Sequence, residues 1–548
     1  MERQIREAVQ KALEDLGAGE APFVVEWPGE LVHGDFATNA AMAAAKQLGK
    51  NPRELAEDLA ARIKETLGDS ATSVTPAGPG FVNITLAPHA ITEVIERAVL
   101  DVEGWGKGTL HEGKRVIIEF SNTNAFKEMH IGHLMSTIIG ESLARITEYQ
   151  GANVCRDSYG GDVGPHVAKA LWGLRDAGIS EPATAEEIGK AYAHGSRAYE
   201  ESEKIKAEID ALNTAIYEGT DHELMELWRK GRDVSIDAFK DLYRLLDTHF
   251  DYLFFESETA GIGTEKVREG LAKGIFEESE GAIIYKGENK GLHTLVFITS
   301  RGTPTYEAKD IGLAFLKEER WPSDVSIIIT AAEQIGHFQV FLAALEDIAP
   351  ALAAKTTHVP HGFLRLSSGK MSSREGNVVT AASLIKDVIE KTLERNEDPL
   401  VAEQVAMGAI KYSILKQSAG SDIIFDFEKS LSLEGDSGPY LQYALVRAKA
   451  VLAKEPESKD ESTPATPYDI ERLITRFPGI IAKAEALSAP HVIAQYLTQL
   501  ASEWNSFYAQ ERVIGGDHET YKLRLAEAFV NTMTNGLRLL GIPTPERM

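Results

Sequence analysis

His130, Gly132 and His133 form the sequence His-Ile-Gly-His, directly before a run with helical spacing that continues to Gln150. The first turn of a helix has unpaired N–H groups and the positive end of the helix dipole, so imidazoles there can donate to phosphate oxygens. Gly132 has no side chain, which would let a flat base lie against the backbone. Metal ligation or ordinary packing also fits this short pattern. Its position after a buried strand favours phosphate chemistry.

A second polar stretch, residues 367–377, is rich in glycine and serine and carries Lys370 and Arg374. A cationic loop of this kind suits closing over a pyrophosphate leaving group. Taken alone, it could equally be a solvated surface turn. Its pairing with the histidine motif is what favours a nucleotide site.

The surrounding patterns predict three domains, because a chain of 548 residues exceeds one hydrophobic core. Residues 1–107 open with a helix (apolar spacing from Ile5 to Leu16) and include a strand at 81–86, which indicates a small α/β domain. Residues 108–395 combine a strand at 116–120 with the helix at 131–150, which is half of a βαβ unit. Two further apolar runs, 296–298 and 325–329, fit the same parallel sheet.

An acidic, helix-rich stretch at about 175–250 is interpreted as an insertion, and residues 396–548 have helical spacing throughout. The expected fold class is therefore α/β with a parallel-sheet catalytic domain, a small α/β N-terminal domain and a C-terminal α-helical bundle.

Composition limits the function classes. Hydrophobic residues make up 43% and charged residues 26% of the chain. No apolar run reaches the about 18 residues of a membrane span, and the N-terminus lacks a secretory or transit pattern, so a cytoplasmic protein is expected. Cys155 is the single cysteine, which excludes an internal disulfide and a Cys-rich zinc site but leaves His/carboxylate sites open. We expect no zinc.

The net charge of -26 argues at first against nucleic-acid binding, because phosphate neutralisation needs clustered Lys and Arg. The acidity is uneven, however. Residues 181–240 contain 14 acids and 8 bases, whereas residues 504–548 contain 5 of each. The C-terminal part could therefore still meet RNA.

Together, His-Ile-Gly-His after a first strand and Lys-Met-Ser-Ser-Arg far downstream resemble the two signature motifs of class I aminoacyl-tRNA synthetases. The stretches 119–129, 306–312 and 334–338 resemble those of the arginyl-tRNA synthetase family. Residues 33–39 and 77–83 are similar to its tRNA-elbow domain, and residues 438–447 and 541–548 to its anticodon-binding domain. The resemblance implies a Rossmann-like catalytic domain. It also implies ATP with Mg²⁺, L-arginine and arginine tRNA as ligands, and a monomer that needs tRNA even to form the adenylate.

The resemblance also implies site residues. The expected arginine site holds Glu119, Asn122, Thr123, Asn124, His133, Tyr306, Asp310 and Gln334. The expected ATP site holds His130, Gly132, His133, Lys370, Met371, Ser372 and Ser373, and catalysis falls to Lys127, His130, His133, Lys370 and Arg374. The expected tRNA contacts are Phe36, Asn39, Tyr440, Gln442, Tyr443, Arg447, Trp504, Tyr508, Arg512 and Met548.

The physical chemistry of arginine agrees with these types. A guanidinium is planar and permanently charged, so its site should offer carboxylates and a phenol, as Glu119, Asp310 and Tyr306 do. Tyr306 and Asp310 would lie one turn of helix apart, so local pairing between them is the alternative.

Three departures from the family pattern stand out. Ser373 replaces the second lysine of Lys-Met-Ser-Lys, and Lys127 is expected to stabilise the phosphates instead. Asn122-Thr-Asn124 replaces Ser-Pro-Asn, so the rigidity that proline gives is lost. The stretch 160–166 stands where many members carry Gly-Asp-Trp-Gly, and its role stays open.

Two other functions stay open from the sequence. One is another activity of the same superfamily, with a different amino acid or without tRNA. The other is a catalytically silent RNA-binding paralogue, against which the intact signature loops argue.

Overall fold

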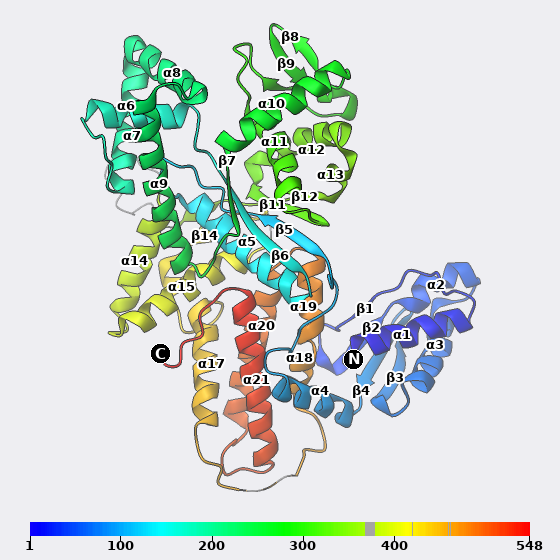
Figure 1. Ribbon diagram of the computed structural model, residues 1–548. Coiled ribbons are helices and arrows are strands. Elements are labelled where there is room, and N and C mark those ends of the chain that lie inside the picture. Colours follow the sequence, from blue (N-terminus) through cyan, green and yellow to red (C-terminus); the bar gives the residue numbers. More distant parts are fainter. Residues whose placement is uncertain (368–378, 419, 459, 461) are drawn as a thin grey trace.

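The computed structural model describes residues 1–367, 379–418, 420–458, 460 and 462–548. A small antiparallel sheet with helices lies beside a group of long C-terminal helices, and a parallel sheet crosses the centre of the molecule (Figure 1). Two further lobes stand above that sheet in the view of Figure 1, one made of α6–α9 and one of α10–α13 with β8–β10.

The N-terminal domain begins with the predicted amphipathic helix, α1 (Glu2–Asp15), whose apolar face is buried. The predicted strand is β4 (Phe81–Leu86), which alternates between buried and partly exposed residues. It lies in an antiparallel sheet of order β1-β2-β4-β3. The other elements are β1 (Val25–Glu26), η1 (Leu31–His33), β2 (Phe36–Thr38), α2 (Ala40–Leu48), α3 (Pro52–Leu67), η2 (Gly68–Ser70) and β3 (Ala71–Ala77).

Helix α4 (Pro88–Leu100) and the segment after it pack against the C-terminal helices. Asn531 donates to the carbonyl of Ala98 at 3.0 Å, and the indole of Trp105 donates to Thr532 at 2.8 Å. Residues 88–107, which the sequence assigns to the N-terminal domain, are thus held by the opposite end of the chain.

The central sheet is parallel throughout, in the order β12-β11-β5-β6-β7. The predicted strands at 116–120 and 325–329 are its members β5 and β11, and the predicted helix is α5 (Ile131–Tyr149). Parallel strands place all their carboxyl ends at one edge, which is where ligands bind in open α/β sheets. The strands are β5 (Arg115–Glu119), β6 (Asn153–Gly160), β7 (Tyr252–Phe255), β11 (Val325–Ala331) and β12 (Thr356–His361).

The prediction for residues 296–298 is wrong. They belong to β10 (Leu295–Ile298), which pairs antiparallel with β9 (Ala282–Tyr285), itself antiparallel to β8 (Glu277–Ser279). An apolar run of four residues cannot reveal which sheet it joins, and here the short loop 286–294 turns the chain back onto β9. Helices α10 (Glu256–Ala272), η3 (Gly287–Lys290), α11 (Tyr306–Arg320), η4 (Ala332–Gln334), α12 (Ile335–Ile348) and α13 (Pro350–Lys355) complete this part.

The acidic insertion is helical, as predicted. It comprises α7 (Ala185–Glu201), α8 (Glu203–Glu218) and α9 (His222–Leu245), which pack with α6 (Pro165–Asp176) around a separate apolar cluster. The long helix α9 runs from this lobe down to the central sheet (Figure 1).

The C-terminal part is helical apart from β14 (Ile423–Phe425), which pairs in parallel with β13 (Leu364–Leu366). Its helices are α14 (Ala381–Leu393), α15 (Pro399–Leu415), α16 (Phe427–Ser430), α17 (Gly438–Leu452), α18 (Asp469–Thr475), α19 (Phe477–Ala486), α20 (His491–Gln510) and α21 (Glu519–Leu539). No helix in the described ranges combines the length and apolar composition needed to cross a membrane.

Candidate active site

The loop that follows β5 is built from strained backbone held by side chains. Ser121, Asn122 and Phe126 have φ of 74°, 52° and 64°, values that non-glycine residues seldom adopt. The hydroxyl of Tyr243 on α9 lies 3.0 Å from Ser121 Oγ and 3.0 Å from Thr123 Oγ1. Hydrogen bonds to α9 therefore supply the rigidity that proline gives in the usual motif.

Asn122 is engaged at both ends of its amide. Its nitrogen donates to Glu119 at 2.8 Å, and its oxygen accepts from the backbone N–H of Tyr159 at 3.0 Å. The structure thus uses this amide to tie β5 to β6. Asn124 packs closely against Gly161, the residue after β6. A Cβ added at Gly161 would lie 2.3 Å from the amide oxygen of Asn124.

Glu119 lies in a buried ionic cluster that the sequence analysis missed. Lys317 on α11 donates to Glu119 at 2.6 Å and pairs with Asp157 on β6 at 2.8 Å. Burial raises the pKa of Asp157, while the two carboxylates outweigh burial and raise that of Lys317. The cluster thus places one lysine between two buried carboxylates beneath the site. The sequence carried one signal of this cluster. Lys317 comes seven residues after Asp310, and this spacing places both side chains on one face of a helix.

Asp310 is paired with a histidine from the next signature stretch. His337 Nε2 lies 2.6 Å from Asp310 Oδ2, and its Nδ1 lies 3.4 Å from Glu307 Oε1. Burial lowers the pKa of His337, but hydrogen bonds to Asp310 and Glu307 outweigh burial and bring it to about 10. The imidazolium therefore fixes one oxygen of Asp310 and leaves the other for a ligand.

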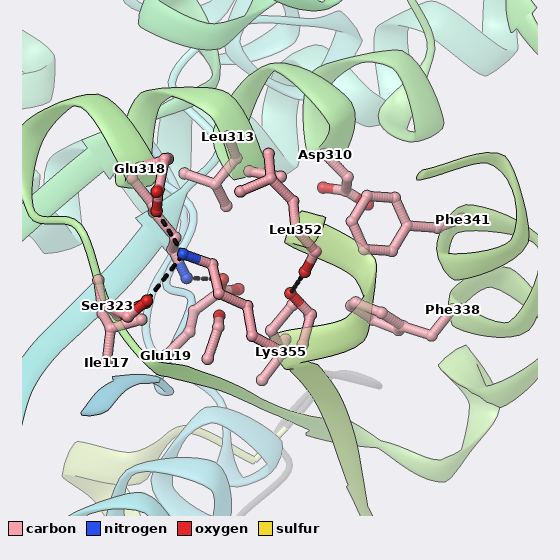
Figure 2. Close-up of a pocket in the computed structure, with 15 residues that line it drawn as sticks. Ile117, Glu119, Asp310, Leu313, Glu318, Ser323, Phe338, Phe341, Leu352 and Lys355 are labelled. Carbon is pink, nitrogen blue, oxygen red and sulfur yellow. Dashed lines mark hydrogen bonds and ion pairs between the residues drawn. The ribbon is translucent and has the colours of Figure 1, made fainter. Parts of the chain in front are cut away.

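Glu119 and Asp310 both line a cavity of about 30 Å³, closed at one end by Lys355, which donates to Ser323 O at 2.8 Å and pairs with Glu318 (Figure 2). A space of this size holds at most a few waters and no arginine side chain. This cavity is therefore not the arginine site.

Tyr306 is the first residue of α11 and is 59% exposed, so its phenol stands at the surface of the site. Beside it, Lys309 lies 5.3 Å from the Tyr306 ring centre and donates to Glu256 at 2.6 Å. Burial raises the pKa of Glu256 to about 7 despite this lysine. Gln334 ends η4 and is exposed.

The two motif histidines stack on each other at the start of α5, with ring centres 3.7 Å apart and planes 22° apart. His130 Nδ1 accepts from the backbone N–H of Gly132 at 3.0 Å, which leaves Nε2 as the donor. Burial and Lys127 lower the pKa of His130, and burial, His130 and Lys127 lower that of His133 to about 3. Both rings are therefore neutral donors.

The segment after the second motif lies against these histidines. His130 and Thr380 form an antiparallel β-bridge, Ile131 N donates to Val379 O at 3.3 Å, and Ala381 N donates to Met129 O at 2.7 Å. The chain thus returns to the start of α5 directly after residue 378. Lys370, Met371, Ser372, Ser373 and Arg374 lie outside the described residues.

Lys127 and the stretch 160–166 complete the site. The Lys127 ammonium is 5.0 Å from the Tyr192 ring centre on α7. A Cβ at Gly160 would lie 2.9 Å from Thr123 O, so glycine is required for the loop to approach β6. Asp162 accepts from Ser257 N at 2.9 Å and from Ser257 Oγ at 2.7 Å. The stretch therefore anchors the active-site loop.

Three of the residues predicted to contact RNA have buried side chains. Phe36 is 2% exposed, Gln442 0% and Trp504 1%. Gln442 donates to the carbonyls of Gln404 and Pro543 at 3.0 and 2.8 Å, and Trp504 stacks on Phe529 at 4.6 Å. The family resemblance implied these contacts, and burial leaves these side chains little surface for RNA in the free protein.

Other predicted RNA contacts cluster at the surface of α17 and α20. The Arg447 guanidinium lies 5.6 Å from the Tyr443 ring centre and 5.4 Å from that of Tyr508. Asn505 donates to the Tyr440 hydroxyl at 3.1 Å and accepts from Arg447 at 3.3 Å.

The remaining predicted RNA contacts lie outside α17 and α20. Arg512 pairs with Glu457, Met548 is partly buried, and Asn39 accepts from Val24 N.

No group of three or more His, Cys, Asp or Glu side chains in the described part of the chain is arranged to hold a metal ion. Cys155 is buried in β6.

Comparison with known proteins agrees with this geometry. The model described as tRNA synthetases class I (R), catalytic domain, matches residues 96–427. The arginyl tRNA synthetase N-terminal domain matches residues 3–86, and the DALR anticodon binding domain matches residues 441–548.

Full-length relatives are similar throughout. The arginine–tRNA ligase of Halothermothrix orenii is 31% identical over 98% of both chains, and that of Fusobacterium nucleatum is 31% identical over 94% of this chain and 93% of its own. The solved arginyl-tRNA synthetase of Thermus thermophilus superposes with a TM-score of 0.83 at 26% identity, covering all of both chains. The chain therefore belongs to the arginyl-tRNA synthetase family, class I ligases that activate arginine with ATP and transfer it to tRNA.

Proposed function

We propose that this chain carries out its family's reaction at the carboxyl edge of β5, β6 and β11, with arginine against α11 and ATP at the start of α5. The observation that carries the proposal is the β-bridge between His130 and Thr380. It holds the start of α5, which carries the histidine motif, against residues 379–381, which follow the second motif in the sequence.

Arginine enters from the open side of Asp310 and Glu119, between Tyr306 and the loop 121–126. The free oxygen of Asp310 and the phenol of Tyr306 accept from the guanidinium, whose fork suits two acceptors. Asn124, Gln334 and His133 hold the ammonium and carboxylate end of arginine in this proposal. Asn122 acts through Glu119, because both ends of its amide are already bonded.

ATP lies over Gly132, with its phosphates at the first turn of α5. The arginine carboxylate attacks the α-phosphorus in line, pyrophosphate leaves, and arginyl-adenylate forms without a covalent enzyme intermediate. Nε2 of neutral His130 donates to the developing charge, as oxyanion donors do. Lys127, Lys370 and Arg374 neutralise the phosphates. The terminal ribose hydroxyl of tRNA then attacks the adenylate carbonyl.

Mg²⁺ accompanies the nucleotide. Phosphate oxygens and waters would supply most of its ligands, as is usual for Mg²⁺ bound with a nucleotide.

On the tRNA side, Tyr443, Tyr508 and Arg447 form a surface on which unstacked bases can lie, since aromatic rings and guanidinium planes stack with bases. Charge does not oppose this placement, because residues 504–548 are balanced in an otherwise acidic chain. We further propose a monomer that acts in the cytoplasm. Light scattering of the purified protein, with and without tRNA, tests the monomer.

Pyrophosphate exchange into ATP tests the proposal, with each of the twenty amino acids tried in turn. Arginine alone should support exchange, and only when arginine tRNA with an oxidised terminal ribose is present. Exchange with another amino acid would place the chain elsewhere in its superfamily. RNA binding without exchange or aminoacylation would indicate a silent paralogue. Equal exchange without tRNA would show that the site is already assembled in the free protein.

A further inference from the structure

Three helices of different regions meet at one place, which is buried around Ser142 and Lys411 and open to solvent around Arg145. Helix α21 of the C-terminal part ends at Leu539, helix α9 of the insertion ends at Leu245, and helix α5, which starts at the histidine motif, passes between them near its own end. The last carbonyls of a helix have no partner within it and carry the negative end of its dipole. Two such ends brought side by side present several carbonyls to the same few donors.

Side chains from two other elements supply those donors. The ammonium of Lys411 on α15 is buried, with 2% of the residue exposed, and donates to Leu246 O at 2.7 Å and to Gly541 O at 2.5 Å. One cation thus caps the ends of both α9 and α21.

Helix α5 contributes the remaining donors. Arg145 donates to Arg538 O at 3.0 Å and to Asp247 O at 2.5 Å, and Ser142 donates to Leu539 O at 3.0 Å. Glu141, one turn before Arg145, holds the guanidinium at 2.6 Å. We call Ser142, Arg145 and Lys411 the helix-end junction.

The junction adjoins the parts of the chain that shape the arginine site. Tyr243, which anchors Ser121 and Thr123, lies two residues before the end of α9. A displacement of that end must therefore move the strained loop 121–126. The other end of α5 carries His130. Helix α21 packs against α17 and α20, the helices that carry the proposed RNA surface.

We propose that Arg145, Ser142 and Lys411 are positioning residues for arginine recognition, which transmit the placement of the C-terminal helices to the loop 121–126 through the ends of α9 and α5. The proposal rests on the proposed function. A cation that grips two helix ends lets neither end move without the other, so RNA held on α17 and α20 biases the geometry of the loop. The coupling runs through side-chain to carbonyl bonds, which substitution can remove one at a time.

The test measures arginine affinity by equilibrium dialysis, with and without oxidised arginine tRNA, on the full-length chain. Lys411→Met removes the shared cap, Arg145→Lys keeps the charge but loses the fork, and Ser142→Ala removes a single bond. We expect tRNA to raise arginine affinity in the parent by about 5- to 150-fold, the usual range for coupled sites. The ratio should fall toward one in Lys411→Met and partly in the other two. The affinity for ATP, and the affinity for tRNA measured without arginine, should not change, whereas the gain in tRNA affinity that arginine gives should fall by the same factor as the ratio.

Ile414→Ala, a buried change elsewhere on α15, is the control for loss of stability. It should lower the thermal midpoint and leave the tRNA-dependent ratio as in the parent. Ser142→Ala keeps the test informative if Lys411→Met does not fold. A parent-like ratio in all three junction variants would overturn the proposal, as would a ratio of one in the parent. If the parent charges tRNA with arginine in either case, the proposed function stands and only the junction's role fails.

Discussion

Replacing Asp310 by asparagine removes one negative charge from the arginine site with little change in side-chain size. One carboxylate oxygen is occupied by His337 Nε2 at 2.6 Å, so the free oxygen is the acceptor for the guanidinium. An asparagine can keep the bond to His337 but offers the substrate no charge. A hydrogen bond to a charged group contributes about 1.5–3 kcal/mol, which corresponds to about 10- to 150-fold.

We therefore expect kcat/KM for arginine to fall about 10- to 150-fold in Asp310→Asn, with inhibition by the neutral isostere citrulline almost unchanged. The assay is aminoacylation with arginine, in competition with citrulline. KM for ATP should not change, because ATP binds at α5. The matched control is Glu318→Gln on the same helix, whose carboxylate pairs with Lys355. If Asp310→Asn preferred arginine to citrulline as strongly as the parent, Asp310 would not contact the guanidinium.

Three further outcomes are expected. His337 has a folded pKa of about 10, above its ordinary value of 6.5. Its contribution to stability is thus complete below pH 6.5 and lost as pH rises through 10, so the difference in thermal midpoint between the parent and His337→Gln should shrink over that range. An unchanging difference would contradict the ionised pair. Gly132→Ala places a Cβ 2.8 Å from His130 Cε1, which should displace the His130 ring. Adenylate formation, measured by pyrophosphate exchange, should then slow by up to about a hundredfold. Exchange at the parent's rate would show that His130 does not act at the phosphates. Trp504→Ala should lower the free energy of unfolding by about 3–5 kcal/mol in denaturant titrations. At temperatures where the variant is folded, its KM for tRNA should equal that of the parent. A raised KM would show that Trp504 contributes to the RNA surface.

The sequence by itself determined the elements that depend on near neighbours. The helix at Ile131–Tyr149, the strands at Arg115–Glu119 and Val325–Ala331 and the helical insertion all follow from local periodicity, which is set by residues a few positions apart. The motif histidines were found from a short contiguous stretch before a helix, and Asp310 from the resemblance of residues 306–312 to the family's signature.

Only the tertiary structure decided which partners those residues take. That Lys317 lies between Glu119 and Asp157, and that His337 holds Asp310, depends on packing between elements far apart in the chain. The sequence placed Trp504 on an RNA surface, but stacking on Phe529 buries it. The local sequence cannot distinguish an aromatic side chain that faces RNA from one that faces a neighbouring helix, because the same ring suits either contact. Only the fold decides whether RNA or a helix covers the ring.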